Sequence, residues 1–156
     1  VMEGISIFIM EKENLDAHGL STLVNKKSGV MGISGVSSDM REIEAAIAQG
    51  NERAKLALQM YDYRIAKYIG AYTAVLGGVD IIVFTGGVGE NQTVTRATVC
   101  RQLEFMGVKI DEELNRTIHG KEADLSVPES KVKVVVIPTD EEYMIASDTQ
   151  EILSNR

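Results

Sequence analysis

The chain has 156 residues, of which 44% are hydrophobic and 25% charged, a composition typical of one globular domain or part of one. Its formal net charge of -7 argues against a nucleic-acid partner, because phosphate backbones are bound by basic patches. No apolar run reaches the length of a membrane span, and no charged-then-apolar signal segment opens the chain.

The first part of the chain reads as helices joined by loops of small residues. Apolar spacing predicts a helix over about 15–24, and the glycines and serines of "SGVMGISGVSSD" predict a loop over 28–39. A short helix is expected over 39–49. Apolar residues at steps of three and four then predict a long helix over 51–76.

Two apolar runs in the second part read as strands. The β-branched run Ile81–Phe84, bounded by glycine pairs, predicts a strand that is buried on both faces. The elements expected after it are a helix over 93–106, a short strand over 108–110, a helix over 111–119, a buried strand over 132–137 and a final helix over about 140–153. This order predicts a helix-rich α/β fold with a small, mainly parallel sheet.

The stretch "DIIVFTGGVGEN", residues 80–91, places glycines between the first expected strand and a helix. Ligands bind beyond the carboxyl ends of parallel strands, and a helix start offers free N–H groups to a phosphate. The stretch lacks both the lysine of a Walker loop and the last glycine of the G-x-G-x-x-G fingerprint. Two interpretations remain open, a nucleotide or phosphate site and a tight turn.

The stretch "SGVSSDMR" combines a helix start with an arginine. Ser38 or Asp39 can cap the helix, and Asp39-x-x-Glu42 resembles a capping box. The helix dipole disfavours Arg41 at this position, so Arg41 either meets an anion or planar ring or is simply solvated.

The stretch "IPTDEE" places Asp140, Glu141 and Glu142 just after the second main strand. The helix dipole favours carboxylates in a first turn, which is one explanation for them. The other explanation is a Mg²⁺ site, because this ion is often held by one or two carboxylates together with substrate phosphates. Taken with the two stretches above, it suggests a nucleotide–magnesium site.

The single cysteine and the two histidines read as structural or surface residues. Cys100 cannot form an internal disulfide, which favours the cytoplasm, and its amphipathic setting predicts a small buried side chain. His18 and His119 lie among polar residues without a partner at metal-ligand spacing. Val1 in place of methionine predicts that the chain is a piece of a longer protein.

Three longer stretches resemble the carboxy-terminal half of the acetate kinase family. They are "NKKSGVMGISGVSSDMRE", "YRIAKYIGAYTAVLGGVDIIVFTGGVGENQ" and "VVVIPTDEEYMIA", in family order from about Leu23 to Thr149. The resemblance implies a ribonuclease-H-like domain of the actin, sugar kinase and heat-shock ATPase superfamily. It also implies reversible transfer of the γ-phosphoryl group of ATP to acetate, giving acetyl phosphate and ADP, by a Mg²⁺-dependent cytoplasmic homodimer. Propionate and butyrate kinases are relatives, and the motifs favour acetate or propionate kinase.

The resemblance also implies roles for single residues. The nucleotide-binding residues are Asp39, Met40 and Arg41, which hold the adenosine part, and Gly87, Val88, Gly89, Glu90 and Asn91. Glu141 is the implied Mg²⁺ ligand. This sequence departs from its relatives at Asp140, where they usually carry asparagine, and an added carboxylate there would tighten or displace the ion.

The family's catalytic residues lie in the amino-terminal part of the protein, and no segment of this sequence matches them. We therefore expect residues 1–156 to be the carboxy-terminal nucleotide-binding portion, with no catalytic residue and little or no activity alone. A stand-alone nucleotide-binding or subunit-association module is the alternative. A portion of a propionate kinase is another, because the acetate pocket lies outside this chain.

Overall fold

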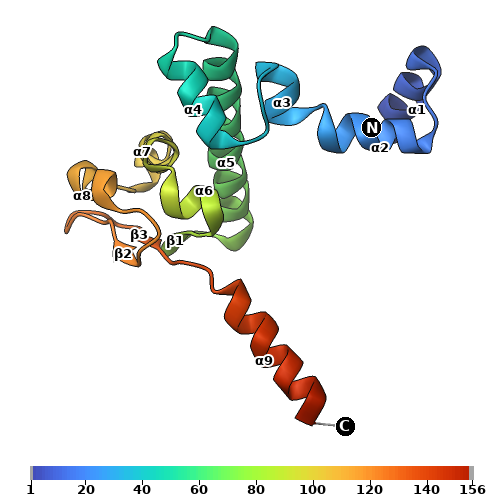
Figure 1. The fold of residues 1–156 in the computed structure, drawn as a ribbon. Coiled ribbons are helices and arrows are strands. Elements are labelled where there is room, and N and C mark those ends of the chain that lie inside the picture. Colours follow the sequence, from blue (N-terminus) through green and yellow to red (C-terminus); the bar gives the residue numbers. More distant parts are fainter. Residues whose placement is uncertain (1, 155–156) are drawn as a thin grey trace. The chain divides into compact units, whose positions relative to one another are not determined.

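The computed structural model describes residues 2–154, apart from the side chains of residues 2 and 3 (Figure 1). The chain divides into two compact units, residues 1–64 and residues 65–156, and the boundary falls inside the long helix α5 (Glu52–Leu76). Each unit has buried apolar residues of its own. None of the helices in the described range is long and apolar enough to cross a bilayer.

The first unit is helical. It contains α1 (Met2–Glu13), α2 (Ala17–Lys26), α3 (Gly29–Ser34), α4 (Met40–Ala48) and the first half of α5. Asp16 begins α2, since its Oδ1 accepts the Gly19 N–H at 2.7 Å. Among the residues of this unit whose side chains the structure describes, the buried apolar ones are Met40, Ile43, Ala54, Ala57 and Leu58.

The predicted loop over 28–39 is wrong over residues 29–34, which form α3. Arg53 stabilises the end of this helix, because its Nε donates to the Ile33 carbonyl at 2.9 Å. Gly35, with φ of 67°, ends α3 in the left-handed conformation. Helix α1, over residues that the sequence left unassigned, is a second difference.

The second unit is an α/β layer. It contains the second half of α5, β1 (Ile81–Phe84), α6 (Gly86–Asn91), α7 (Thr93–Gln102), the 3-10 turn η1 (Glu104–Met106), α8 (Glu112–Thr117), β2 (Ala123–Asp124), β3 (Lys133–Val136) and α9 (Glu141–Ser154). The sheet order is β1-β3-β2, and β1 and β3 are parallel as predicted. β2 is antiparallel to β3 and was not predicted. The expected strand over 108–110 is reduced to single bridges at Val108 and Ile110.

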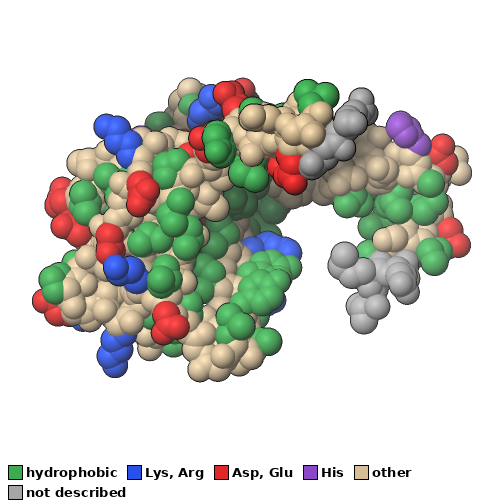
Figure 2. Space-filling view, turned by 90° about the horizontal axis from the view of Figure 1, so that it is seen from below, with side chains coloured by type: hydrophobic (Ala, Val, Ile, Leu, Met, Phe, Trp, Pro, Cys, Tyr) green, Lys and Arg blue, Asp and Glu red, His purple; other side chains and the backbone are tan. Residues whose placement is uncertain are grey.

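The core of the second unit lies against one face of the sheet. Ile82 and Phe84 of β1 are buried in a cluster that includes Val99 of α7, whereas Ile81 and Val83 are 52% and 47% exposed. The prediction that β1 is buried on both faces is therefore wrong, because the core cluster covers only one side of it. Apolar side chains reach the surface in many places (Figure 2).

The sheet positions the two segments of greatest interest at one edge. β1 and β3 pair in register, with Phe84 opposite Val136. The Ile137 N–H donates to the Phe84 carbonyl at 3.0 Å, which extends the pairing to the carboxyl ends of both strands. The chain therefore enters α6 and the segment before α9 from adjacent points.

Candidate functional site

Glu90 joins the two segments that leave the carboxyl edge of the sheet. Its Oε1 accepts the Thr139 N–H at 2.9 Å and the Thr139 hydroxyl at 3.1 Å. The backbone hydrogen bond from Thr139 is the main reason why the pKa of Glu90 lies below its usual value. The structure thus brings the predicted nucleotide segment, Gly87–Asn91, to within two residues of the predicted metal ligand, Glu141.

The glycine-rich stretch forms the short helix α6, whereas the sequence had suggested a tight turn as one of two interpretations. Gly86, with φ of 68°, takes a conformation that favours glycine and turns the chain from β1 into α6. A Cβ at Gly89 would lie 3.0 Å from the Phe84 carbonyl carbon, so close packing requires this glycine. A Cβ at Gly87 would meet nothing within 4 Å. Packing within the chain therefore gives no reason for glycine at position 87.

The carbonyl groups of α6 accept hydrogen bonds from its own end, Asn91 and Gln92, and from three residues elsewhere in the unit, Arg96, His119 and Gly120. The bonds are Asn91 Nδ2 to Gly87 at 3.0 Å, Gln92 N to Val88 at 2.9 Å, Arg96 Nη1 to Gly89 at 2.8 Å, Gly120 N to Glu90 at 3.2 Å and His119 Nδ1 to Asn91 at 3.2 Å. His119 is exposed, as expected, but no sequence pattern indicated this contact. Helix α6 is therefore tied down at its carboxyl end.

Arg96 is the functional candidate that sequence reasoning missed. Its side chain is completely buried, and it also bonds to Asn115, whose Nδ2 donates to the Thr93 carbonyl at 2.9 Å. One feature of the sequence could have indicated its burial: the arginine stands on the apolar side of α7, next to Ala97 and close to Cys100.

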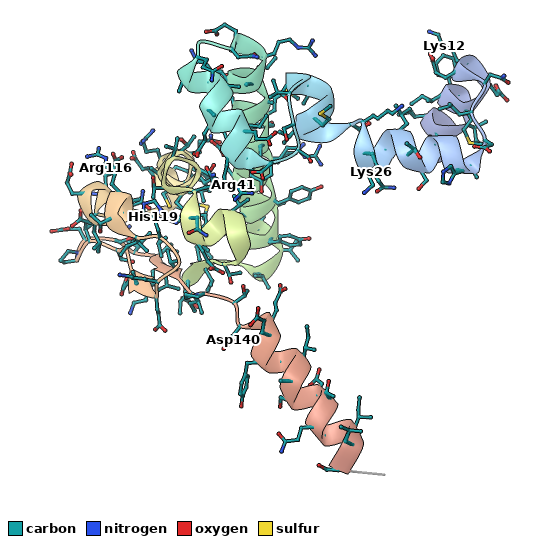
Figure 3. All side chains as sticks on the ribbon, in the orientation of Figure 1. Lys12, Lys26, Arg41, Arg116, His119 and Asp140 are labelled. Carbon is teal, nitrogen blue, oxygen red and sulfur yellow. The ribbon has the colours of Figure 1, made fainter. Side chains whose placement is uncertain are left out.

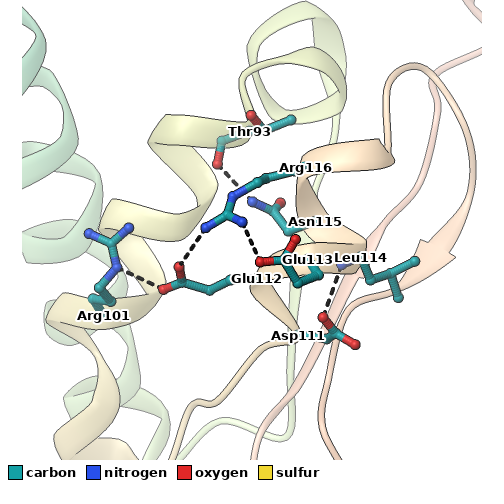
Figure 4. A network of polar contacts seen from close by, with 8 residues as sticks. All are labelled: Thr93, Arg101, Asp111, Glu112, Glu113, Leu114, Asn115 and Arg116. Atoms are coloured by element: carbon teal, nitrogen blue, oxygen red, sulfur yellow. Dashed lines mark hydrogen bonds and ion pairs between the residues drawn. The ribbon is translucent and has the colours of Figure 1, made fainter.

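A polar network surrounds this contact and fixes α8 beside α7 (Figure 4). Arg101 Nε of α7 binds Glu112 Oε1 at 2.9 Å, and Arg116 pairs with Glu112 and Glu113 within α8. Asp111 caps α8, because its Oδ1 accepts the Leu114 N–H at 2.9 Å. Exposed ion pairs each add little to stability, so we infer that the role of these pairs is to orient α8.

Asp39 and Arg41 form a fork at the start of α4. Asp39 Oδ1 accepts the Arg41 N–H at 2.9 Å, which confirms the predicted cap, and the carboxylate also binds the guanidinium, with Nη2 to Oδ2 at 2.6 Å. The Asp39 N–H donates to Ser37 Oγ at 3.0 Å, so Glu42 does not complete a capping box. The Arg41 side chain is 85% exposed, whereas that of Met40 is buried and leaves only its backbone for a ligand.

Glu141 lies exposed in the first turn of α9. It directly follows Asp140, which Figure 3 labels at the start of that helix. Asp140 Oδ1 accepts the Tyr143 N–H at 3.0 Å and so caps the helix. Asparagine, which the family resemblance implies at this position, can make the same bond. Within the part of the chain that the structure describes, no three acidic, histidine or cysteine side chains gather as a complete metal site.

The predicted site residues are divided between the two units. Asp39, Met40 and Arg41 belong to the first unit, and Gly87–Asn91 and Glu141 belong to the second. Inside the second unit, the Glu90–Thr139 contact is the link between the nucleotide segment and the metal segment.

Comparison with known proteins places this geometry in a family. The sequence model of the Acetokinase family matches residues 1–147. The chain belongs to the Acetokinase family. Curated acetate kinases of Porphyromonas gingivalis (strain W83) and Bacteroides thetaiotaomicron are 65% and 67% identical to it over 150 residues. That alignment covers 96% of this chain and 38% of each relative, so the chain spans less than half their length.

Solved structures of the family confirm the predicted fold class. A crystal structure of Porphyromonas gingivalis acetate kinase matches with a TM-score of 0.88 at 65% identity, covering 96% of this chain and 38% of that one. The acetate kinase of Entamoeba histolytica matches with a TM-score of 0.87 at 34% identity, covering 97% and 39%. A propionate kinase of Francisella tularensis matches with a TM-score of 0.81 at 34% identity, covering 92% and 36%. The acetokinase chain therefore has the actin-like, ribonuclease-H-like fold of acetate kinases.

Proposed function

We propose that the chain forms the nucleotide-binding side of an acetate kinase, which reversibly transfers the γ-phosphoryl group of ATP to acetate to give acetyl phosphate and ADP. The Glu90–Thr139 contact carries the proposal, because it holds a glycine-rich helix and a carboxylate together at the carboxyl edge of the sheet. Membership of the Acetokinase family supports the same reaction.

The nucleotide contacts are assigned to Asp39–Arg41 and Gly87–Asn91. The open space at Gly87 supports this, since a glycine that packing does not require suits close approach by a ligand. The exposed guanidinium of Arg41 is held in place by Asp39 and can stack on the planar base of a nucleotide. Met40 contributes through its backbone, since its side chain is buried.

The residues present fit a magnesium ion as one wall of its site. Glu141 offers one exposed carboxylate, and Mg²⁺ is commonly held by one or two carboxylates together with nucleotide phosphates and waters. When bound, the ion would neutralise charge on the transferring phosphoryl group. Asp140 serves as the helix cap through Oδ1, which leaves Glu141 as the assigned ligand.

Titration calorimetry with MgADP tests the nucleotide assignment. In the 156-residue chain we expect Gly87→Ala and Arg41→Ala each to weaken MgADP binding about tenfold, roughly 1.4 kcal/mol. Gly87→Ala should leave the free energy of unfolding unchanged or slightly higher, because the added methyl group has space and alanine favours a helix.

Matched controls separate loss of binding from loss of structure. Gly70→Ala makes the same change in α5, where a Cβ also meets nothing within 4 Å. Arg116→Ala removes another exposed, carboxylate-paired arginine. Both controls should bind MgADP like the parent chain. Equal affinity in the controls and in both test variants would refute the nucleotide assignment.

Acetate is preferred over propionate as the substrate, because the acetate kinase of Porphyromonas gingivalis is 65% identical to this chain and the propionate kinase of Francisella tularensis only 34%. Family membership also supports action as a cytoplasmic homodimer. Measuring acetyl and propionyl phosphate formation side by side tests the substrate assignment. Because the acetate pocket lies outside this chain, the measurement has to be made on the longer protein that the proposed function implies, with its own pocket and not that of a relative.

A further inference from the structure

Arg96 is a fully buried cation whose hydrogen-bond partners carry no charge. Its guanidinium donates to Asn115 Oδ1 at 2.8 Å and to the carbonyl groups of Gly89 at 2.8 Å, Asn115 at 3.1 Å and Ile118 at 2.7 Å. Removal from water lowers the pKa of Arg96. Burying a charge without a counter-ion is unfavourable. The arginine therefore has to provide an advantage that an apolar side chain lacks, and its hydrogen bonds to backbone carbonyl groups are that advantage.

The four bonds connect two separate backbone segments. One bond reaches Gly89 inside α6, and the others reach Asn115 and Ile118 at α8 and just after it. The residues that follow Ile118 bind α6 in their own right, with Gly120 N on the Glu90 carbonyl at 3.2 Å and His119 Nδ1 on the Asn91 carbonyl at 3.2 Å. The Arg96 guanidinium therefore binds α6 directly, and it also binds the 118–120 segment, which in turn binds the carboxyl end of α6.

We propose that Arg96 is a positioning residue, which fixes the backbone of Gly86–Asn91 in the orientation that binds the nucleotide. It acts through the Gly89 carbonyl and the 118–120 segment, and its complete burial keeps it from touching the nucleotide. This inference rests on the function proposed above. A lysine cannot replace the arginine, because a single ammonium group cannot span Gly89 and Asn115 as a planar fork does.

The test compares Arg96→Lys with Arg101→Lys in the 156-residue chain. Arg101 lies on the same helix but is exposed and pairs with Glu112, so it controls for the chemistry of the exchange. Amide hydrogen exchange of Gln92 and Gly120, whose N–H groups bind α6 carbonyls, reports the anchoring of α6 without any nucleotide. The ¹⁵N signals of the His119 ring report the contact with Asn91.

In Arg96→Lys we expect Gly120 exchange to accelerate at least tenfold, the His119 signals to shift and MgADP affinity to fall about tenfold. Arg101→Lys should change none of these. If Arg96→Lys does not fold, as judged by circular dichroism, Asn115→Ser replaces it. That variant removes the acceptor of Arg96 Nε, together with the Nδ2 donor to the Thr93 carbonyl, and leaves the bonds of Arg96 to the three carbonyls, so the same changes should appear at smaller size.

The outcomes distinguish this proposal from the function it rests on. Unchanged exchange, or faster exchange with unchanged MgADP affinity, would overturn the positioning role. Failure of the parent chain to bind MgADP would overturn the proposed function and the nucleotide part of this inference. The exchange measurement would then still decide whether Arg96 anchors α6.

Discussion

At the scale of single residues, Asp39 caps helix α4 and also forms an ion pair with Arg41. The Asp39 carboxylate caps α4 through one oxygen and grips the guanidinium of Arg41 with both. A capping residue was predictable from its type and position, since aspartate commonly begins a helix. The fork with Arg41 was not, because a side-chain rotamer leaves no pattern in a sequence.

A titration of Asp39 tests this fork. Its side-chain hydrogen bond to Arg41 lowers the pKa of Asp39 from 3.8 to about 2. The carboxyl takes up its proton at a higher pH in the unfolded chain, so the stabilisation is complete above about pH 4 and is lost as the pH falls through 2. The carboxyl ¹³C signal should show a midpoint near 2, and Arg41→Ala should move that midpoint toward 3.8. The fork is disproved if the midpoint stays near 2 without Arg41.

Cys100 is a residue for which sequence reasoning was sufficient. It occurs at a core position of an amphipathic helix, and the structure confirms that it is buried, with 2% exposure. Burial raises the pKa of the Cys100 thiol to about 12, which keeps it protonated and unreactive near neutral pH. Arg96 stands on the same helix and was missed, because polarity predicted exposure for it.

At the scale of elements, the long periodic helices and the short helix α8 were predictable, whereas the two glycine-rich helices of six residues were not. Helices α4 and α5 begin and end close to the expected residues, since apolar steps and terminal glycines mark them. Helix α7 begins as expected but ends at Gln102, and the 3-10 turn η1 takes the place of its expected last turn. Helices α3 and α6 are too short and too rich in glycine to show a helical period. The two-residue strand β2 is likewise too short to show an alternating pattern.

The glycines of α6 yield a prediction about stability. Gly89→Ala should lower the free energy of unfolding by about 1–3 kcal/mol, because the new methyl group presses on the Phe84 backbone, which cannot rotate away. Gly70→Ala, also inside a helix but in open space, should change it by no more than about 1 kcal/mol and in the stabilising direction. Urea unfolding measures both values. A Gly89→Ala protein as stable as the parent would show that α6 does not pack on β1 as described.

At the scale of the whole molecule, the sheet formed by the described residues has three strands, and the core cluster found among them lies on one of its faces. β1 lies at the edge of the described sheet, with Ile81 and Val83 exposed. Apolar runs correctly indicated where β1 and β3 lie, but a run of β-branched residues cannot show which face neighbouring elements cover. For the same reason, the sequence could not show that Thr139 meets Glu90.

Activity is also a property at this scale. We expect the 156-residue chain alone to form no acetyl phosphate above background. Phosphoryl transfer needs several positioned charged groups, whereas the proposed function assigns one metal ligand, Glu141, and no catalytic residue to this chain. A chimera that joins it to the remaining part of the Porphyromonas gingivalis enzyme should be active. A coupled assay for ADP formation measures both proteins. Robust turnover by the pure chain would reveal catalytic groups that the proposed function does not include.

The two hydrogen bonds between Glu90 and Thr139 join positions 49 residues apart in the sequence. Because of these bonds, a change in the orientation of α6 would also change the orientation of the first turn of α9. Under the proposed function, nucleotide and metal then bind as thermodynamically linked ligands. Linkage is reciprocal, so the factor by which the metal tightens the nucleotide equals the factor by which the nucleotide tightens the metal. This threonine–carboxylate contact would set part of that common factor, because it joins the nucleotide segment to the metal segment.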